Sequence, residues 1–148
     1  MITSKNKIII YTDGACIGNP GLGGWGAIII NRNIEKKISG GSKLTTNNRM
    51  EMLAVIEALQ FIESSSIITL YTDSQYIIKG ISSWITKWKE NNWTSSNRKP
   101  IKNIDLWKKI DVLTVKHSIE WRWVKGHSGN HYNEEVDKLA RAEAERFK

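Results

Sequence analysis

The stretches Ile8-Ile-Ile-Tyr-Thr-Asp13 and Ile68-Thr-Leu-Tyr-Thr-Asp73 decide the fold of this 148-residue chain. Each is a run of β-branched and aromatic residues, which is typical of a buried strand, and each ends on an aspartate. Because a carboxylate costs too much free energy to bury alone, such an aspartate is either a solvated cap or a ligand for something cationic.

The residues after the first ending predict an antiparallel meander. Strand signals cover 7–12, 25–31 and 34–39, and the glycine-rich segment 14–24 has the composition of turns. Three strands joined by short connections pair antiparallel.

The rest of the chain alternates helices with strands. An apolar stripe at helical spacing predicts a helix over 48–62, with Thr46 or Asn47 as its N-cap. Further helices are predicted at 75–80, 81–88, 103–113 and 134–147, and strands at 67–72 and 118–124. A meander followed by strand–helix units implies an α/β fold with a mixed sheet flanked by helices. We find no repeat and no internal boundary, which predicts a single domain over 1–148.

Composition narrows the class of protein. The net charge is +7 and the pI about 9.5, which favours a polyanionic partner such as nucleic acid, although a solubility charge is an open alternative. The single cysteine, Cys16, cannot form an internal disulfide, which fits a reducing compartment. Apolar runs are far shorter than the ~20 residues of a membrane span, and no secretory signal is evident. We expect a cytoplasmic protein with no membrane partner.

Four carboxylates stand in distinctive settings. Asp13 and Asp73 end strands that, as parallel neighbours, would present both side chains at one sheet edge. Glu51 and Asp137 are predicted in the first turns of their helices, where acids also occur simply because of the helix dipole. Four acids converging in one place would hold divalent metal ions, and hard oxygen ligands suit Mg²⁺.

Five motifs carry a family resemblance. They are 11–21 (YTDGACIGNPG), 45–51 (TTNNRME), 71–76 (YTDSQY), 102–107 (KNIDLW) and 123–129 (WVKGHSG). Five such stretches in this order are specific, and the chain resembles type 1 ribonuclease H, close to its bacterial members, over about 8–146. The resemblance implies a five-stranded sheet in the order 3-2-1-4-5 and a monomer.

The resemblance also implies the reaction, hydrolysis of the RNA strand of RNA–DNA hybrids to 5′-phosphate and 3′-hydroxyl ends. By the same resemblance, Asp13, Glu51, Asp73 and Asp137 would hold two Mg²⁺ ions ~4 Å apart, Mn²⁺ being an alternative. His127 matches a catalytic histidine that shuttles a proton or assists product release. The other two histidines, His117 and His131, are predicted to be surface residues.

Substrate contacts are implied in three groups. Cys16, Glu51 and Gln75 match residues that contact 2′-hydroxyls, Asn19, Asn47 and Asn48 match residues that reach the minor groove, and Thr46 and Asn103 match residues that grip a phosphate of the DNA strand. Asparagines near turns are also ordinary turn formers. Leu44 departs from the arginine that many relatives carry at the phosphate pocket, and the adjacent Lys43 lacks its bidentate fork. We therefore expect a weaker grip on the DNA strand.

A basic protrusion is implied by the segment 84–102. Its residues are Trp84, Lys87, Trp88, Lys89, Trp93, Arg98, Lys99 and Lys102. The lysines would neutralise phosphates, and the indole faces would pack on the sugar–phosphate backbone. Core packing at helical spacing is the alternative for Trp84 and Trp88. Trp25, Trp107, Trp121 and Trp123 are predicted to lie in the core.

Two other functions remain open at this point. Another nuclease or strand-transfer enzyme of the same fold is possible on fold alone, although the Asn47-Asn48 pair and the protrusion argue against it. A hybrid-binding module without catalysis would be expected to have lost one of the carboxylates, and all four are present.

Overall fold

The structure, a computed structural model, describes residues 7–126 and 129–148. Over these residues, five strands form one mixed sheet in the order β3-β2-β1-β4-β5. They are β1 (Lys7–Ile17), β2 (Gly21–Asn31), β3 (Ile34–Thr45), β4 (Ile67–Thr72) and β5 (Ser118–Trp123). β1, β2 and β3 form the predicted antiparallel meander, whereas β4 runs parallel to both β1 and β5. The predicted fold class and strand order are confirmed.

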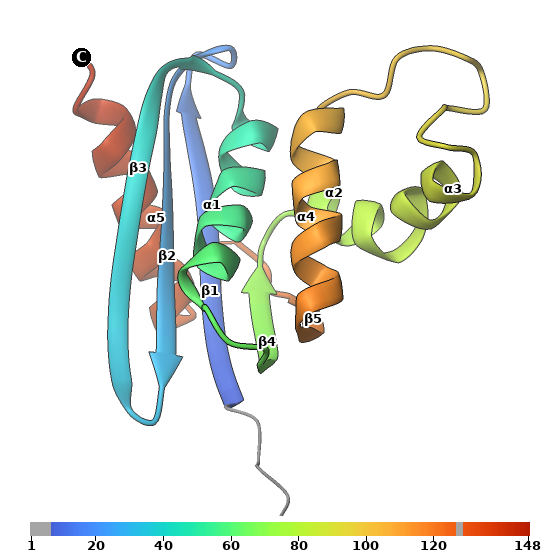
Figure 1. The fold of residues 1–148 in the computed structure, drawn as a ribbon. Coiled ribbons are helices and arrows are strands. Elements are labelled where there is room, and N and C mark those ends of the chain that lie inside the picture. The colour runs from blue at the N-terminus through green and yellow to red at the C-terminus, as the bar shows by residue number, and fades with distance from the viewer. Residues whose placement is uncertain (1–6, 127–128) are drawn as a thin grey trace, which may run out of the picture.

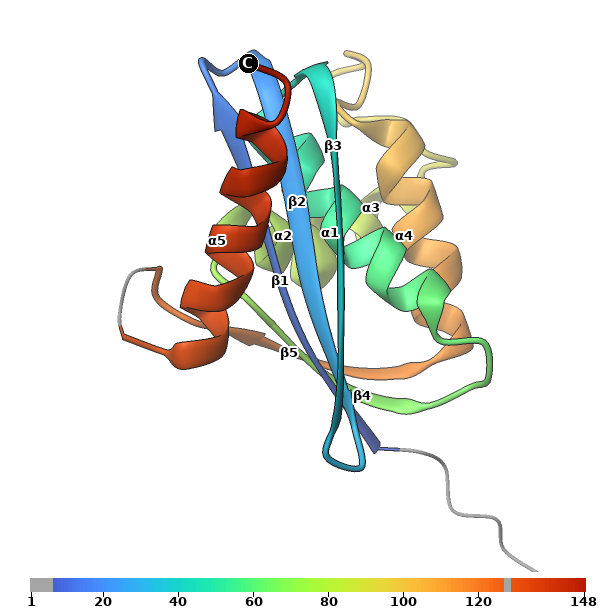
Figure 2. The same cartoon turned by 90° about the vertical axis from the view of Figure 1, so that its left-hand side faces the viewer.

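Helices cover the two faces of the sheet unequally. Figure 2 shows α5 (His131–Glu145) on one face, and α1 (Asn47–Phe61) with α4 (Ile104–Lys116) on the other. A helical run of α2 (Gln75–Lys79), the π-helical turn η1 (Gly80–Trp84) and α3 (Ile85–Glu90) extends beyond α4 (Figure 1). Within the described residues, no helix has the length and apolar character needed to cross a membrane.

The core lies between the sheet and α1. Ile8 and Ile10 on β1 and Ile68 and Leu70 on β4 alternate with more exposed neighbours, as strand periodicity requires, and all four side chains are buried. The apolar stripe of α1 packs against them. This packing fixes the ends of β1 and β4 relative to α1, which is where three of the acids lie.

The glycine-rich segment predicted as turns belongs mostly to strands. β1 continues to Ile17 and β2 begins at Gly21, so the connection between them is short. Several of these glycines allow helices to approach the sheet closely: a Cβ on Gly24 would lie 2.0 Å from the carbonyl oxygen of Ala140 in α5. The turn prediction holds for 18–20, which connect the two antiparallel strands, whereas glycines such as Gly24 allow close approach of backbones.

Helix boundaries also differ from the prediction. Thr46 caps α1, accepting a hydrogen bond from the Arg49 amide at 3.3 Å. Glu51 is therefore the fifth residue of α1, beyond its first turn. α5 begins at His131, since Asn130 caps it, and Asp137 consequently lies in its second turn. The dipole explanation for these two acids loses force, because the effect fades beyond the first turn.

His117 is buried, contrary to the prediction of a surface residue. His117 is only 7% exposed, and its Nδ1 accepts a hydrogen bond from the Ser66 amide at 3.1 Å. Burial lowers the pKa of this imidazole, which suits a neutral ring in the folded protein.

Candidate active site

The sheet places Asp13 beside Asp73. β1 and β4 are parallel neighbours in the register Thr12↔Thr72, so the next residue on each chain is one of the two aspartates. Asp13 does not end its strand as predicted, because β1 continues to Ile17 paired with β2 alone. It lies instead directly after the last residue of β1 that pairs with β4.

Glu51 reaches the same place from α1. The helix approaches β1 at Gly14, where an added Cβ would lie only 2.4 Å from the Glu51 backbone nitrogen. A glycine directly after Asp13 is thus required for α1 to bring its carboxylate against the sheet edge. Glu51 is 5% exposed and Asp13 is 3% exposed.

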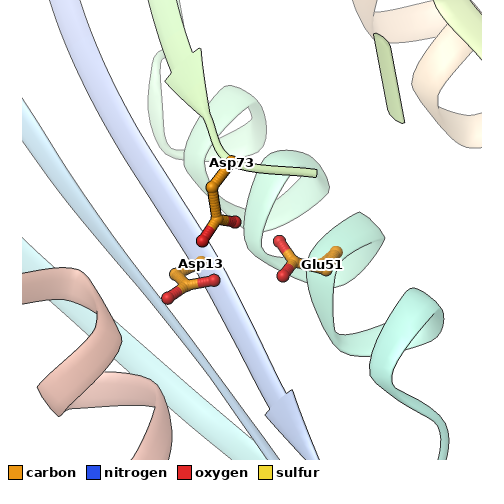
Figure 3. A group of neighbouring side chains, drawn as sticks. All are labelled: Asp13, Glu51 and Asp73. Carbon is orange, nitrogen blue, oxygen red and sulfur yellow. The ribbon is translucent and has the colours of Figure 1, made fainter. Parts of the chain in front are cut away.

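The three carboxylates form one cluster. Each offers an oxygen atom within 4.8 Å of the others, and Figure 3 shows the side chains of Asp13, Glu51 and Asp73 turned toward one another. Among the described residues, Oε2 of Glu51 is buried without a hydrogen-bond partner. The cluster thus offers three carboxylates as hard oxygen ligands, and one of them has a buried oxygen that no hydrogen bond satisfies. Such a set fits a divalent cation of the Mg²⁺ or Mn²⁺ type.

The cluster is electrostatically costly without a cation. Burial, followed by the charge of Asp73, raises the pKa of Asp13 to about 8. Burial and the neighbouring charge of Asp13 also raise the pKa of Glu51 well above its ordinary value. Strongly raised carboxylate pKa values in a cavity are typical of functional sites, because the fold holds the charges together at its own expense.

Asp137 stands apart from the three-residue cluster. It lines the same cavity, but its Oδ2 pairs with Nε of Arg141 at 3.1 Å, one turn further along α5. The structure therefore brings three of the four predicted acids together and leaves the fourth facing them across the cavity. Sequence reasoning missed Arg141, although an arginine four residues after an aspartate on a helix is a recognisable pairing signal.

His127 lies outside the described residues, so its predicted role stays a prediction. Its neighbour Gly126 is described, and an added Cβ there would lie 3.0 Å from Oδ2 of Asp73. The backbone entering the His127 loop therefore passes directly beside the carboxylate cluster.

The residues predicted to contact RNA line two connected sides of the site. Cys16 lines the carboxylate cavity, and its thiol donates to the carbonyl oxygen of Thr45 at 3.4 Å. A second depression is shared by Asn47, Asn48 and Gln75 with Glu51 and Asp73. Asn19 joins this group through its side-chain oxygen, which accepts from the Asn47 amide at 3.0 Å.

Arg49 connects the two residues predicted to grip a DNA phosphate. Its amide donates to Thr46, and its Nη1 donates to Oδ1 of Asn103 at 3.1 Å while the guanidinium pairs with Asp105. Leu44 is 75% exposed and offers no charge in this region. Thr46 and Asn103 are therefore brought together through Arg49, and their contact with a DNA phosphate stays a prediction.

The protrusion divides into a packed part and an exposed part. Trp84 and Trp88 are half-buried, with ring centroids 6.3 Å and 6.0 Å from that of the fully buried Trp107. Packing thus accounts for much of both side chains. The lysines Lys87, Lys89 and Lys99 are exposed, and Lys89 pairs with Asp111 at 3.2 Å.

The prediction that Trp123 lies in the core is wrong. Trp123 is 47% exposed at the end of β5, and its indole Nε1–H donates to the carbonyl oxygen of Asp73 at 3.1 Å. The same prediction holds for Trp107, while Trp25 and Trp121 are half-buried.

Fold and site together define a class, an α/β enzyme with a buried carboxylate site suited to a divalent cation. A family model for RNase H matches residues 5–145. The chain belongs to the RNase H family, and the resemblance seen in the sequence is confirmed.

Individual relatives agree. A ribonuclease H of Pseudoalteromonas translucida is 57% identical over 137 residues, 93% of this chain and 89% of the relative. One of Francisella philomiragia is 54% identical over 140 residues, 95% of this chain and 92% of the relative. The crystal structure of LC9-RNase H1, a type 1 RNase H with the type 2 active-site motif, has a TM-score of 0.89 at 28% identity, covering 100% of this chain and 76% of that one.

Proposed function

We propose that this chain is an endoribonuclease that hydrolyses the RNA strand of RNA–DNA hybrids, leaving 5′-phosphate and 3′-hydroxyl ends. The observation that carries the proposal is the cluster of Asp13, Glu51 and Asp73 at the end of the β1–β4 pairing, in a chain of the RNase H family. The net charge of +7 supports a polyanionic substrate.

The carboxylates would hold two divalent ions, Asp13 being the ligand shared by both. When bound, such ions activate the attacking water and stabilise the leaving 3′ oxygen. Asp137 would complete the ligand set from α5, where it lines the same cavity while its Oδ2 pairs with Arg141. The hard oxygen donors favour Mg²⁺, with Mn²⁺ as a substitute.

The remaining residues would position the hybrid. Selecting RNA requires contacts to 2′-hydroxyls, and Cys16, Glu51 and Gln75 line the two depressions where the RNA strand would lie. The Asn19–Asn47 contact would present Asn47 and Asn48 to the minor groove. Thr46 and Asn103, linked through Arg49, would receive a phosphate of the DNA strand.

The proposal extends to the protein's setting. We propose a single domain acting as a monomer in the cytoplasm. One cysteine in the sequence, which leaves no internal disulfide, supports a reducing compartment.

A cleavage assay tests the function. Four end-labelled substrates of one sequence, RNA–DNA hybrid, duplex RNA, single-stranded RNA and duplex DNA, would be incubated with Mg²⁺ or with EDTA. The proposal predicts metal-dependent cutting of RNA in the hybrid alone. Binding of the hybrid without cutting would instead indicate a binding module, and cutting of duplex DNA would indicate a DNA nuclease of the same fold.

A further inference from the structure

Trp123 is an exposed aromatic residue held in place beside the carboxylate cluster. In the β4–β5 pairing Trp123 lies opposite Thr72, the residue that precedes Asp73. Its indole Nε1–H donates to the carbonyl oxygen of Asp73 at 3.1 Å, yet 47% of the residue is exposed. A large apolar ring that is exposed and at the same time anchored by its polar atom is suited to contact a ligand.

Trp123 borders two neighbouring depressions. The first contains Asp73 and Glu51 of the cluster, together with Gln75 and the Asn47-Asn48 pair. The second is lined by Gln75, Ile78, Lys79 and Trp123, so the two depressions share Gln75 and Trp123. A strand whose scissile phosphate lies at the carboxylates can therefore continue past Gln75 onto the ring of Trp123.

The second depression has the charge that such a strand needs. Lys79 is exposed in the last turn of α2, and no carboxylate stands among the four described residues that line the depression. An ammonium group beside an aromatic face matches the alternation of phosphate and sugar along a nucleic acid backbone.

We propose that Trp123 and Lys79 form a subsite for the RNA strand next to the scissile position, with the indole packing on a ribose or base and Lys79 neutralising the adjacent phosphate. The proposal rests on the proposed hybrid ribonuclease function and adds a contact beyond the carboxylate, asparagine and glutamine residues. It explains why a tryptophan at the end of β5 is left uncovered.

A purely structural role for Trp123 makes a different prediction. In that case its contribution is the hydrogen bond to Asp73, which both Trp123→Phe and Trp123→Ala remove. In a subsite, the aromatic face contributes, so Trp123→Phe keeps most of the function and Trp123→Ala loses it.

The first experiment measures hybrid affinity in EDTA, together with KM and kcat in Mg²⁺. We expect Trp123→Ala to raise Kd and KM on the order of 10-fold, the effect of removing one aromatic–nucleotide contact, with Trp123→Phe within about 2-fold of the starting protein. Equal losses of kcat in both variants, with KM unchanged, would overturn the subsite. Circular dichroism and thermal unfolding establish that both variants are folded.

The second experiment locates the phosphate. Lys79→Ala should reduce the slope of log Kd against log salt by about 0.9, the value for one phosphate contact, whereas Lys36→Ala on the opposite edge strand should leave it unchanged. Hybrids with a single neutral methylphosphonate, moved along the RNA strand, should show one position at which neutralisation weakens the starting protein but not Lys79→Ala. If hybrid cleavage is intact and no position couples to Lys79, the subsite is wrong while the proposed function stands; if the hybrid is not cut at all, the function itself fails.

Discussion

The carboxylate cluster and the aromatic cluster (Tyr76, Trp84, Trp88, Trp93 and Trp107) differ in what they do for the fold. Trp84, Trp88 and Trp93 were predicted to belong to a substrate-binding protrusion, with core packing as the alternative for Trp84 and Trp88, whereas Trp107 was predicted to lie in the core. The carboxylate cluster buries like charges, and the pKa of Asp13 is raised to about 8 as a result. The aromatic cluster buries rings against one another, with the Trp107 indole and the Asn103 amide both donating to the Tyr76 hydroxyl. The carboxylate cluster thus lowers the stability of the fold, whereas the aromatic cluster raises it.

The comparison gives each region its own signature on substitution. Removing an acid from the carboxylate cluster should remove activity and relieve repulsion. Removing a ring from the aromatic cluster should weaken the packing of the helical run 75–90 against α4. It should therefore lower the stability of the protein, and any effect on substrate binding should follow from that loss.

The largest expected effect is on catalysis. Asp13→Asn should reduce the rate of hybrid cleavage on the order of 1000-fold or more, because it removes the central carboxylate of a preorganised charged site. Asp111→Asn, at a half-buried aspartate paired with Lys89, is the matched control and should keep the normal kcat, because releasing Lys89 changes substrate affinity and not the chemical step. Near-normal cleavage by Asp13→Asn would show that the cluster is not the catalytic centre.

Trp84→Ala should act on stability. Its ring contacts those of Tyr76, Trp88 and Trp107, so truncation should lower the free energy of unfolding by about 2–3 kcal/mol. Urea denaturation measures this, with kcat determined at a temperature where the variant is folded. A large fall in kcat with unchanged stability would place Trp84 in the substrate site instead and erase the contrast between the two regions.

His127→Ala should slow turnover by about 10–100-fold, the usual range for an acid–base group. His131→Ala is a suitable control, since that side chain is 82% exposed at the start of α5. Single-turnover and steady-state rates should be compared, because a role in product release would slow only the second. Equal rates in both variants would make His127 a bystander.

Substituting Lys87, Lys89 and Lys99 together should have the smallest effect. We expect KM to rise about 3- to 10-fold and its salt slope to fall by about 2 rather than 3, because Lys89 already pairs with Asp111. Steady-state kinetics over a salt series measures both. An unchanged slope would mean that the exposed side of the protrusion does not touch the hybrid.

Much of this arrangement could be predicted from local sequence. The two Tyr-Thr-Asp endings report strand periodicity, and parallel strands in neighbouring positions bring equivalent residues to the same edge. Asp13 and Asp73 could therefore be placed together from physics, whereas Glu51 needed the family resemblance, because nothing local indicates that α1 approaches at Gly14.

Other features depend on contacts between distant residues, which the local sequence does not predict. The Ser66 amide that binds His117 lies 51 residues away, so burial of the ring has no local signal. Trp123 shares the strand alternation of core residues, and its exposure depends on what covers the end of β5. The helix that carries Asp137 begins at His131, three residues earlier than its apolar pattern suggests, because Asn130 caps it.

The central claim is that the carboxylate cluster destabilises the fold until a cation binds. It predicts that the stability of the protein depends on pH as well as on metal. The pKa of Asp13 is about 8 in the folded protein and 3.8 ordinarily, so between these values the folded state binds more protons than the unfolded state. Stability of the metal-free protein should therefore fall as pH rises from about 4 to about 8.

The most direct measurement is thermal unfolding of the starting protein and Asp13→Asn in EDTA at pH 4 and pH 8, and again at pH 8 with Mg²⁺. At pH 8 in EDTA, Asp13→Asn should have a Tm higher by about 5 °C, a difference that shrinks at pH 4. Mg²⁺ should raise the Tm of the starting protein more than that of the variant. A variant less stable than the starting protein at pH 8, or no response of either to Mg²⁺, would contradict the claim.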